Sequence, residues 1–260
     1  MATPLLLLDL SRVLLAGVML LYASFMDLRT REVQNWVWAV FGPLGLLLSL
    51  LEWFHLRVVD PVWGLALPVL LSTALSFLFF YLGLYGGADA KAFITLSLLT
   101  PHHPRTVKPL LGVVSPIYPL TIFTDSTLIA VLFALALLTR NLLWRLRTHR
   151  PLFEGLEDEA PWRKGLALLG CMKVEARSIR GPPYQYPAEV VAGGRRRLRL
   201  LPDIHDDVAA EETFRVLVED LGLREVWVSY TLPFLLFISL GFLCSLLLGD
   251  LALWILETIF

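Results

Sequence analysis

The chain has 260 residues, of which 57% are hydrophobic and 17% are charged, and its formal net charge at pH 7 is -1. An apolar fraction of this size excludes an ordinary soluble protein of this length. The composition predicts a polytopic α-helical membrane protein with about six transmembrane helices and a small α+β cytoplasmic domain.

The predicted transmembrane helices follow one another as apolar segments along the chain. The second, third and sixth contain no charged residue and are each long enough, at about 1.5 Å per residue, to cross about 30 Å of hydrocarbon. The first carries Asp9 and Arg12 near its start, and we expect both side chains to snorkel to the outer headgroups. In chain order the six predicted spans are Leu5–Phe25, Val33–Leu51, Val62–Ala88, Ala88–Leu99, Leu120–Leu143 and Val226–Gly249.

The fourth predicted span is short, because Pro101 must end it and the helix covers only about 18 Å. We therefore expect a helix that starts within the bilayer, or a locally thinned membrane. The prolines in and beside Leu110–Phe123 favour an outer loop or a re-entrant segment there. The first span could instead be a cleavable signal peptide, although no basic cluster precedes it and Asp27 follows it directly.

Basic residues set the expected orientation, since they favour the cytoplasmic side of a membrane. One side of the predicted bundle has Arg29, Arg31, Lys91, Arg140, Arg145, Arg147 and Arg150, and the other has Arg57, Arg105 and Lys108. We therefore expect a multi-pass protein with both termini outside and with Asp27 and Asp89 at the cytoplasmic face.

Several polar and aromatic residues then fall at the outer face or at the membrane surface. The expected helix ends in the outer headgroup layer are Asp9, Asp60, Asp125 and Asp250. We also expect exposed histidines in an outer loop at His102 and His103, and interfacial aromatic anchors at Trp36, Trp38 and Trp53.

The segment between the fifth and sixth predicted spans contains most of the charge of the protein. Met172–Arg177 is predicted as a strand, and Glu189–Val191 with Arg195–Leu200 as a hairpin around Ala192-Gly193-Gly194. Asp206 or Asp207 can cap a helix that runs to Leu221, with Gly222 as its stop. The predicted organisation is a transmembrane core at 1–147, a cytoplasmic α+β insert at 148–225 and a C-terminal transmembrane helix at 226–260.

The predicted hairpin is strongly basic. Its arginines are Arg195, Arg196, Arg197 and Arg199, and they indicate either contact with anionic lipid or a solvated strand edge; nucleic acid is a weaker candidate for a hairpin tethered to a membrane. Cys171 and Cys244 lie in different regions and indicate neither a disulfide framework nor a zinc site. We expect no metal and no cofactor.

Asp27 and Asp89 are the strongest candidates for a catalytic pair, because an ionised side chain in a bilayer is costly and therefore a functional candidate. Two carboxyls a few Å apart repel each other and take opposite protonation states. One can then draw a proton from water while the other donates to a peptide carbonyl, and the proton belongs to the pair rather than to either residue.

The residues around Asp89 are suited to an approaching peptide. Gly86 and Gly87 allow backbone geometries that other residues avoid and leave room for an extended substrate, and Ala88 is also small. Asp89 begins a predicted helix, whose N-terminus stabilises negative charge. Lys91 adds positive charge nearby or serves only as a topology anchor.

At these residues the chain resembles the archaeal preflagellin and type IV prepilin peptidases, membrane aspartic proteases of the GxGD class. Asp27 matches the first catalytic aspartate, and Arg29, Val33 and Asn35 follow in a spacing similar to the family's pattern. Asp89 matches the second, with Ala88 where the motif has glycine. The resemblance extends to the soluble insert and to the C-terminal segment, so it covers most of the chain.

The resemblance implies endoproteolysis at the cytoplasmic membrane face that removes a short basic leader from archaellin or pilin-like precursors. A presenilin-like protease that cuts within membrane spans is an alternative, because two aspartates also occur in that class. The other alternative is a non-enzymatic transporter or scaffold that uses the acids for protons, although the sequence contains no repeated halves.

Overall fold

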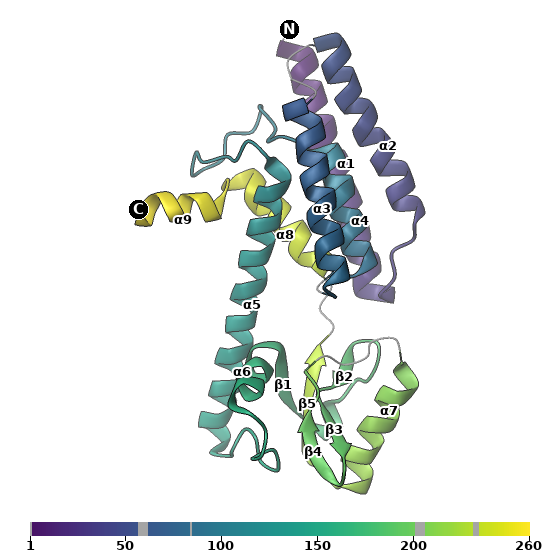
Figure 1. The fold of residues 1–260 in the computed structure, drawn as a ribbon, viewed down its shortest axis with the longest axis vertical. Coiled ribbons are helices and arrows are strands. Elements are labelled where there is room, and N and C mark those ends of the chain that lie inside the picture. Colours follow the sequence, from purple (N-terminus) through teal and green to yellow (C-terminus); the bar gives the residue numbers. More distant parts are fainter. Residues whose placement is uncertain (1, 57–61, 84, 201–205, 231–233) are drawn as a thin grey trace. The chain divides into compact units, whose positions relative to one another are not determined.

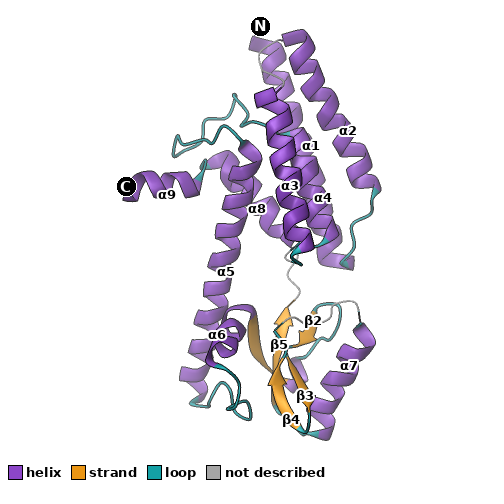
Figure 2. Cartoon of the chain, in the orientation of Figure 1, coloured by secondary structure: helices purple, strands orange, loops and turns teal. Residues whose placement is uncertain are grey.

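The computed structural model describes residues 2–56, 62–83, 85–200, 206–230 and 234–260 (Figure 1). The chain divides into two compact units, Met1–Ala130 with Pro233–Phe260, and Val131–Leu232. We call the first the helical unit and the second the mixed unit, because every described strand belongs to the second (Figure 2). The mixed unit is thus longer at both ends than the expected insert at 148–225.

The helical unit consists of helices, several of which pack against α4. Its elements are α1 (Ala2–Thr30), α2 (Trp36–Leu51), α3 (Leu67–Tyr81), α4 (Gly87–Leu99), the start of α5 (Tyr118–Thr148), α8 (Phe234–Leu247) and α9 (Leu251–Ile259). A π-helical turn, Glu52–Leu56, continues α2, and another, Val62–Ala66, precedes α3.

Helix α4 is the central element of this unit, with α1, α2, α3 and α8 packed against it. Phe93, Leu96 and Leu99 of α4 are at most 1% exposed and belong to the core of the unit. Helix α2 comes especially close, because a Cβ atom added at Gly45 would lie 2.7 Å from the backbone nitrogen of Leu99. Small residues permit such close packing between membrane helices.

The long apolar helices support a multi-pass helical membrane protein. Four are long and apolar enough to cross a membrane: Pro4–Thr30, Trp36–Phe54, Trp63–Tyr81 and Tyr118–Thr148. Helices α8 and α9 together form a fifth candidate that is bent by 58°. The described residues therefore contain four or five candidate spans rather than exactly six, because α4 ends at Leu99, just ahead of Pro101.

The break between α8 and α9 is paired with the loop before α5. The amides of Leu110 and Leu111 donate to the carbonyl oxygens of Leu247 and Leu248, at 2.8 and 3.0 Å. These bonds satisfy carbonyls that the end of a helix leaves without partners. The segment Leu110–Phe123, predicted as an outer loop or a re-entrant segment, is irregular up to Ile117 and helical from Tyr118.

The mixed unit combines two short helices with two small sheets. After the end of α5 its elements are α6 (Pro161–Gly170), β1 (Cys171–Glu175), a 3-10 turn (Ala176–Ser178), β2 (Gln185–Pro187), β3 (Glu189–Ala192), β4 (Arg195–Leu198), α7 (Asp207–Arg215), a π-helical turn (Val216–Asp220) and β5 (Glu225–Tyr230). The first sheet has the antiparallel order β1-β5-β2, and β3 pairs with β4.

Local signals in the sequence correctly predicted much of this unit. Strand β3 pairs with β4 in the predicted hairpin, and Gly193 and Gly194 have φ of 59° and 74°, as a two-residue turn with a primed geometry requires. The side chain of Asp206 accepts from the Ala209 amide at 2.9 Å and caps α7. Gly222 follows at a φ of 63°, consistent with its predicted role as a stop.

The predicted transmembrane helix Val226–Gly249 is wrong in its first part. Residues Glu225–Tyr230 form β5, the central strand of the three-stranded sheet, and helix α8 begins only at Phe234. Val226, Trp227 and Val228 are all fully buried. A strand covered on both faces reads as a continuous apolar run, which composition alone does not distinguish from a membrane helix.

Candidate active site

Asp27 and Asp89 lie at helix ends of the helical unit. Asp27 is half-buried in the last turn of α1, and Asp89 is 9% exposed in the first turn of α4, a helix that packs against α1. The charge of Asp27 acts on the Asp89 carboxyl group, and the charge of Arg31 acts on Asp27. The two acids predicted from the sequence therefore lie close enough for the charge of one to act on the other.

The Asp89 carboxylate is held by backbone amides. The Gly86 amide donates to Asp89 Oδ2 at 3.0 Å, and the Leu235 backbone, in the first turn of α8, makes a second hydrogen bond. Amides in the first turn of a helix have no partner within the helix and favour a nearby anion. Asp89 thus has a defined orientation at the N-termini of two helices.

The small residues before Asp89 form an open surface. Gly86 and Gly87 are exposed and Ala88 is half-buried. Gly86 has an extended backbone, with a φ of -73° and a ψ of 161°, so this position does not use the conformational freedom expected of glycine. A Cβ atom at Gly86 would lie 3.1 Å from Asp89 Oδ2, so the lack of a side chain keeps the approach to the carboxylate open.

A direct hydrogen bond joins the two sequence motifs. Lys91 Nζ, on α4, donates to Asn35 Oδ1, just before α2, at 2.7 Å. The bond is exposed and ties the segment that follows Asp27 to the helix that begins with Asp89. Arg29 is also exposed, two residues beyond Asp27 at the end of α1.

A second polar cluster in the helical unit was missed by the sequence analysis. Arg12 is 1% exposed, and it donates to Leu99 O at 2.6 Å and to Glu52 Oε2 at 3.0 Å. Arg105 Nη1 and His102 Nε2 lie 2.7 and 3.1 Å from the same Glu52 carboxylate. The sequence signal for this cluster is an arginine inside one apolar helix and a glutamate at the end of the next.

The burial of residues in the helical unit corrects three expectations. Arg12 and Asp9 do not snorkel to the headgroups, because both side chains are buried, with Asp9 Oδ2 accepting from the Thr106 amide at 3.2 Å. His102 and His103 are half-buried rather than exposed. Of the three tryptophans expected as interfacial anchors, Trp38 is buried, at 9% exposure, while Trp36 and Trp53 are exposed.

Two of the other acids expected at the outer helix ends, Asp125 and Asp250, are also buried. Asp125 accepts from the Leu251 amide at 3.1 Å, and Asp250 accepts from the Thr121 hydroxyl at 2.7 Å and caps α9. Asp60 lies outside the described residues. Asp250 is therefore a helix-end residue, as expected, whereas Asp125 lies about two turns inside α5, and both bind protein groups.

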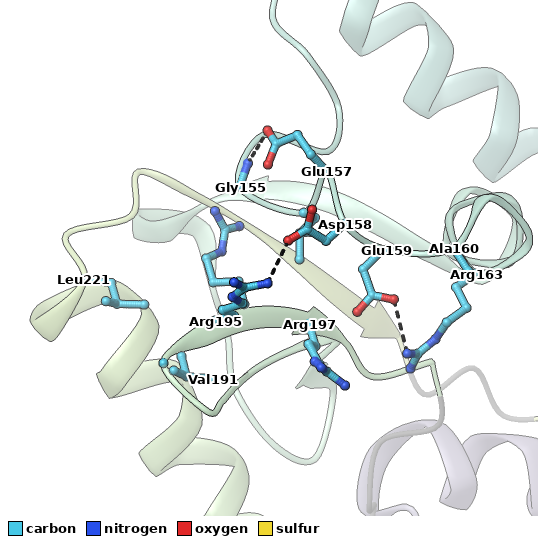
Figure 3. A pocket seen from close by; sticks show the side chains of 13 residues that line it. Gly155, Glu157, Asp158, Glu159, Ala160, Arg163, Val191, Arg195, Arg197 and Leu221 are labelled. Carbon is cyan, nitrogen blue, oxygen red and sulfur yellow. Dashed lines mark hydrogen bonds and ion pairs between the residues drawn. The ribbon is translucent and has the colours of Figure 1, made fainter.

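The arginines of the predicted hairpin are not equivalent. Arg195 pairs with Asp158 at 3.2 Å, and Arg196 pairs with the buried Glu189. Both line a cavity of about 600 Å³ in the mixed unit, together with Arg163 and its partner Glu159 (Figure 3). Arg197 and Arg199 have no salt bridge within the described parts of the chain, and they line a neighbouring hollow beside the exposed Trp162.

Metal ligation finds no support among the residues that the structure describes. No group of three or more His, Cys, Asp or Glu side chains there could hold a metal ion. Cys171 and Cys244 are both free thiols.

Comparison with known proteins identifies two matching families. Residues 14–139 match the type IV leader peptidase family, and residues 170–251 match the archaeal peptidase A24 C-terminus type II. The first match contains both Asp27 and Asp89.

The chain is also similar over most of its length to three preflagellin peptidases. The one from Methanococcus voltae is 26% identical over 89% of this chain and 92% of the relative. Those from Methanocaldococcus jannaschii and Methanococcus maripaludis are 22% and 23% identical, over 91% and 89% of this chain and 93% and 92% of the relatives. These matches confirm the resemblance that the sequence motifs indicate.

Proposed function

The chain belongs to the type IV leader peptidase family, and we propose that Asp27 and Asp89 are its catalytic pair. Membership makes it an aspartic-type endopeptidase that cleaves leader peptides. The substrate that we propose is an archaellin or type IV pilin-like precursor, from which the enzyme removes the short basic leader at the cytoplasmic membrane face. The names of the three relatives support a preflagellin substrate.

The proposed reaction uses the two carboxyl groups in opposite protonation states. The ionised carboxylate takes a proton from water, and the water oxygen attacks the carbonyl carbon of the peptide bond. The protonated carboxyl group donates its proton to the carbonyl oxygen, which gives a neutral tetrahedral intermediate. When the C–N bond breaks, a proton passes to the departing amine, and the carbonyl forms again as a carboxylic acid.

The observation that carries this assignment is that the charge of Asp27 acts on the Asp89 carboxyl group, which lies beside an open glycine surface. Two neighbouring acids that repel each other hold one proton more readily than two separate acids do. Exposed Gly86 and Gly87 leave room beside Asp89 for the main chain of an extended peptide. The remaining motif residues, Lys91, Asn35 and Arg29, are proposed to shape the approach of the substrate.

The alternatives from the sequence are not favoured by the family comparison. A transporter or scaffold would not require the leader peptidase match over 14–139. A presenilin-like protease that cuts within spans would likewise leave the similarity to preflagellin peptidases unexplained.

For topology we propose six crossings, with α4 as a short span, and the active site on the cytoplasmic side. The support is the group of basic residues near the ends of α1 and α5 and at Lys91. An impermeant thiol reagent applied to intact cells tests this. A cysteine at the 85% exposed Arg177 should stay unlabelled, and one at the exposed Lys108 should react; the reverse pattern refutes the orientation.

Anionic lipid is the proposed contact of the basic hairpin formed by Arg195, Arg196, Arg197 and Arg199. Of these, Arg197 and Arg199 should contribute most, because Arg195 and Arg196 are already paired with acids. A spin label at the exposed Val191, with the full chain in nanodiscs, reports the contact. Lipid-soluble oxygen should reach the label better in anionic than in neutral nanodiscs, and Arg197→Gln with Arg199→Gln should remove the difference. Equal accessibility in both lipids refutes the contact.

Co-expression with precursor proteins tests the proposed function. The wild-type chain should shorten archaellin or pilin precursors by the length of the leader, whereas Asp27→Asn and Asp89→Asn should each leave them intact while still accumulating in the membrane. Asp158→Asn, an exposed acid of the mixed unit, is the matched control and should cleave normally. Substantial cleavage by either dyad variant refutes the assignment, and cleavage of only one precursor class identifies the substrate.

A further inference from the structure

Tyr85 lies immediately before the glycines that precede Asp89, in the turn between α3 and α4. Its side chain is 8% exposed, and its ring packs against Phe79 and Phe234, with centroid distances of 5.3 and 4.8 Å. The Tyr85 amide also donates to the Phe79 carbonyl oxygen at 3.2 Å. Ring contacts therefore hold the side chain of Tyr85, and a hydrogen bond holds its backbone.

The hydroxyl of this fixed ring is unusual. Tyr85 Oη is buried and has no hydrogen-bond partner among the residues that the structure describes. Buried tyrosine hydroxyl groups are normally paired, and a buried polar group without a partner is unfavourable. A ligand that binds during function could explain this hydroxyl, because it would supply the missing hydrogen-bond partner.

The position of Tyr85 relative to Asp89 supplies that explanation. Its ring contacts Phe234, and the next residue, Leu235, contributes the backbone hydrogen bond to the Asp89 carboxylate. The charge of Asp89 acts on Tyr85 as well. A phenol keeps its proton up to about pH 10, so at neutral pH this group is a hydrogen-bond donor.

We propose that the Tyr85 hydroxyl is a catalytic hydrogen-bond donor that binds the carbonyl oxygen of the scissile peptide bond in the transition state. This inference rests on the proposed function of Asp27 and Asp89. The protonated carboxyl group of the pair transfers its proton to that oxygen, and Tyr85 stabilises the negative charge that develops there before the transfer is complete; its own proton stays on the phenol. Donors aimed at such an oxygen lower the barrier strongly, and their contacts shorten only when the substrate is bound.

The substitution Tyr85→Phe in the full-length enzyme tests the proposal, because it removes only the hydroxyl and keeps the ring. With a precursor that the wild type cleaves, kcat should fall by about 10²-fold or more, while KM stays within about twofold. The midpoint of thermal unfolding should stay the same or rise, because an unpartnered buried hydroxyl is lost.

The matched control is Tyr81→Phe. Tyr81 is in the last turn of α3, its ring contacts Phe77 and Phe80, and it is 81% exposed. This variant also loses a hydroxyl from an aromatic cluster and should keep wild-type kcat.

Two outcomes overturn the Tyr85 proposal. One is wild-type kcat in Tyr85→Phe, and the other is a lower kcat accompanied by a lower unfolding midpoint, which indicates a structural role. Both leave the dyad assignment intact as long as the wild type cleaves and Asp89→Asn does not. Cleavage by Asp89→Asn, in contrast, removes the proposed function itself.

Discussion

Two buried acids of the helical unit, Glu52 and Asp89, differ in the charges around them. Glu52 is surrounded by Arg12, Arg105 and His102, with nitrogen to oxygen distances of 2.7 to 3.1 Å. Asp89 is held by backbone amides and has another acid, Asp27, as an electrostatic neighbour. Arg12 and Asp27 are both on α1, about 22 Å apart along its axis.

This difference separates a structural acid from a candidate catalytic one. Glu52 forms ion pairs with Arg12 and Arg105, and it thereby joins α1 and the end of α2 to the loop that contains His102 and Arg105. Asp27 and Asp89 repel each other, and a proton is the smallest group that relieves the repulsion. A labile proton between two carboxyls is what hydrolysis requires.

The largest expected effect is on activity, at the dyad. Asp89→Asn should lower the cleavage rate by about 10³-fold or more, because one partner of the acid-base pair is lost. Its unfolding midpoint should be unchanged or higher than that of the wild type, because a buried charge next to a like charge is removed. A gel assay of precursor processing and thermal unfolding in detergent measure both quantities. A clear loss of stability would place Asp89 with Glu52 as a structural acid.

The second largest effect is expected at Glu52, where stability should fall and activity should be retained. Glu52→Gln leaves the buried Arg12 without its counter-ion, and breaking a buried pair in this way costs about 3–5 kcal/mol of the free energy of unfolding. The cleavage rate per folded molecule should stay within a few fold. Glu257→Gln, at an exposed position on α9, is the control and should change neither quantity. A stable Glu52→Gln protein that no longer cleaves would contradict the division into a structural acid and a candidate catalytic one.

A smaller effect is expected at the bond that joins the two motifs. Lys91→Met removes the donor to Asn35, and cleavage should fall several-fold because the segment after Asp27 is no longer tied to α4. The stability should change by less than about 1 kcal/mol, because the bond is exposed. In a double-mutant cycle with Asn35→Ala the two losses should not add. Additive losses would mean that the residues act separately, and Lys108→Met is the control for removal of an exposed charge.

The smallest effect on cleavage is expected in the mixed unit. Asp206→Ala removes the N-cap of α7 and should cost about 1 kcal/mol of the stability of that unit. Processing should continue, because Asp206 is a cap and Asp207 is bound to the Tyr186 hydroxyl at 2.6 Å. A triple variant that also has alanine at Asp207 and at Asp203, which lies outside the described residues, should still cleave the precursor. A folded triple variant that does not cleave would show that catalytic groups extend beyond the dyad.

Local patterns in the sequence were sufficient for the features that depend on neighbouring residues. The apolar helices follow from composition, and the turn at Gly193 and Gly194 follows from the need for two positive φ angles. The cap at Asp206 likewise needs only an amide three residues away. The two aspartates were found because charge next to an apolar span is costly and because their motifs resemble those of a known family.

Contacts between distant residues were decided only by the tertiary structure. Arg12 on α1 donates hydrogen bonds to Glu52, which follows α2, and to Leu99 of α4. The residues next to Arg12 in the sequence do not indicate these partners. Val226–Val228 are apolar enough for a membrane span, but pairing with β1 and β2 makes them a central strand. The packing of the Tyr85 ring likewise depends on Phe79 and Phe234, which lie on different helices. Burial and the pairing of charges are properties of the packed chain, because each depends on what the fold places beside a residue.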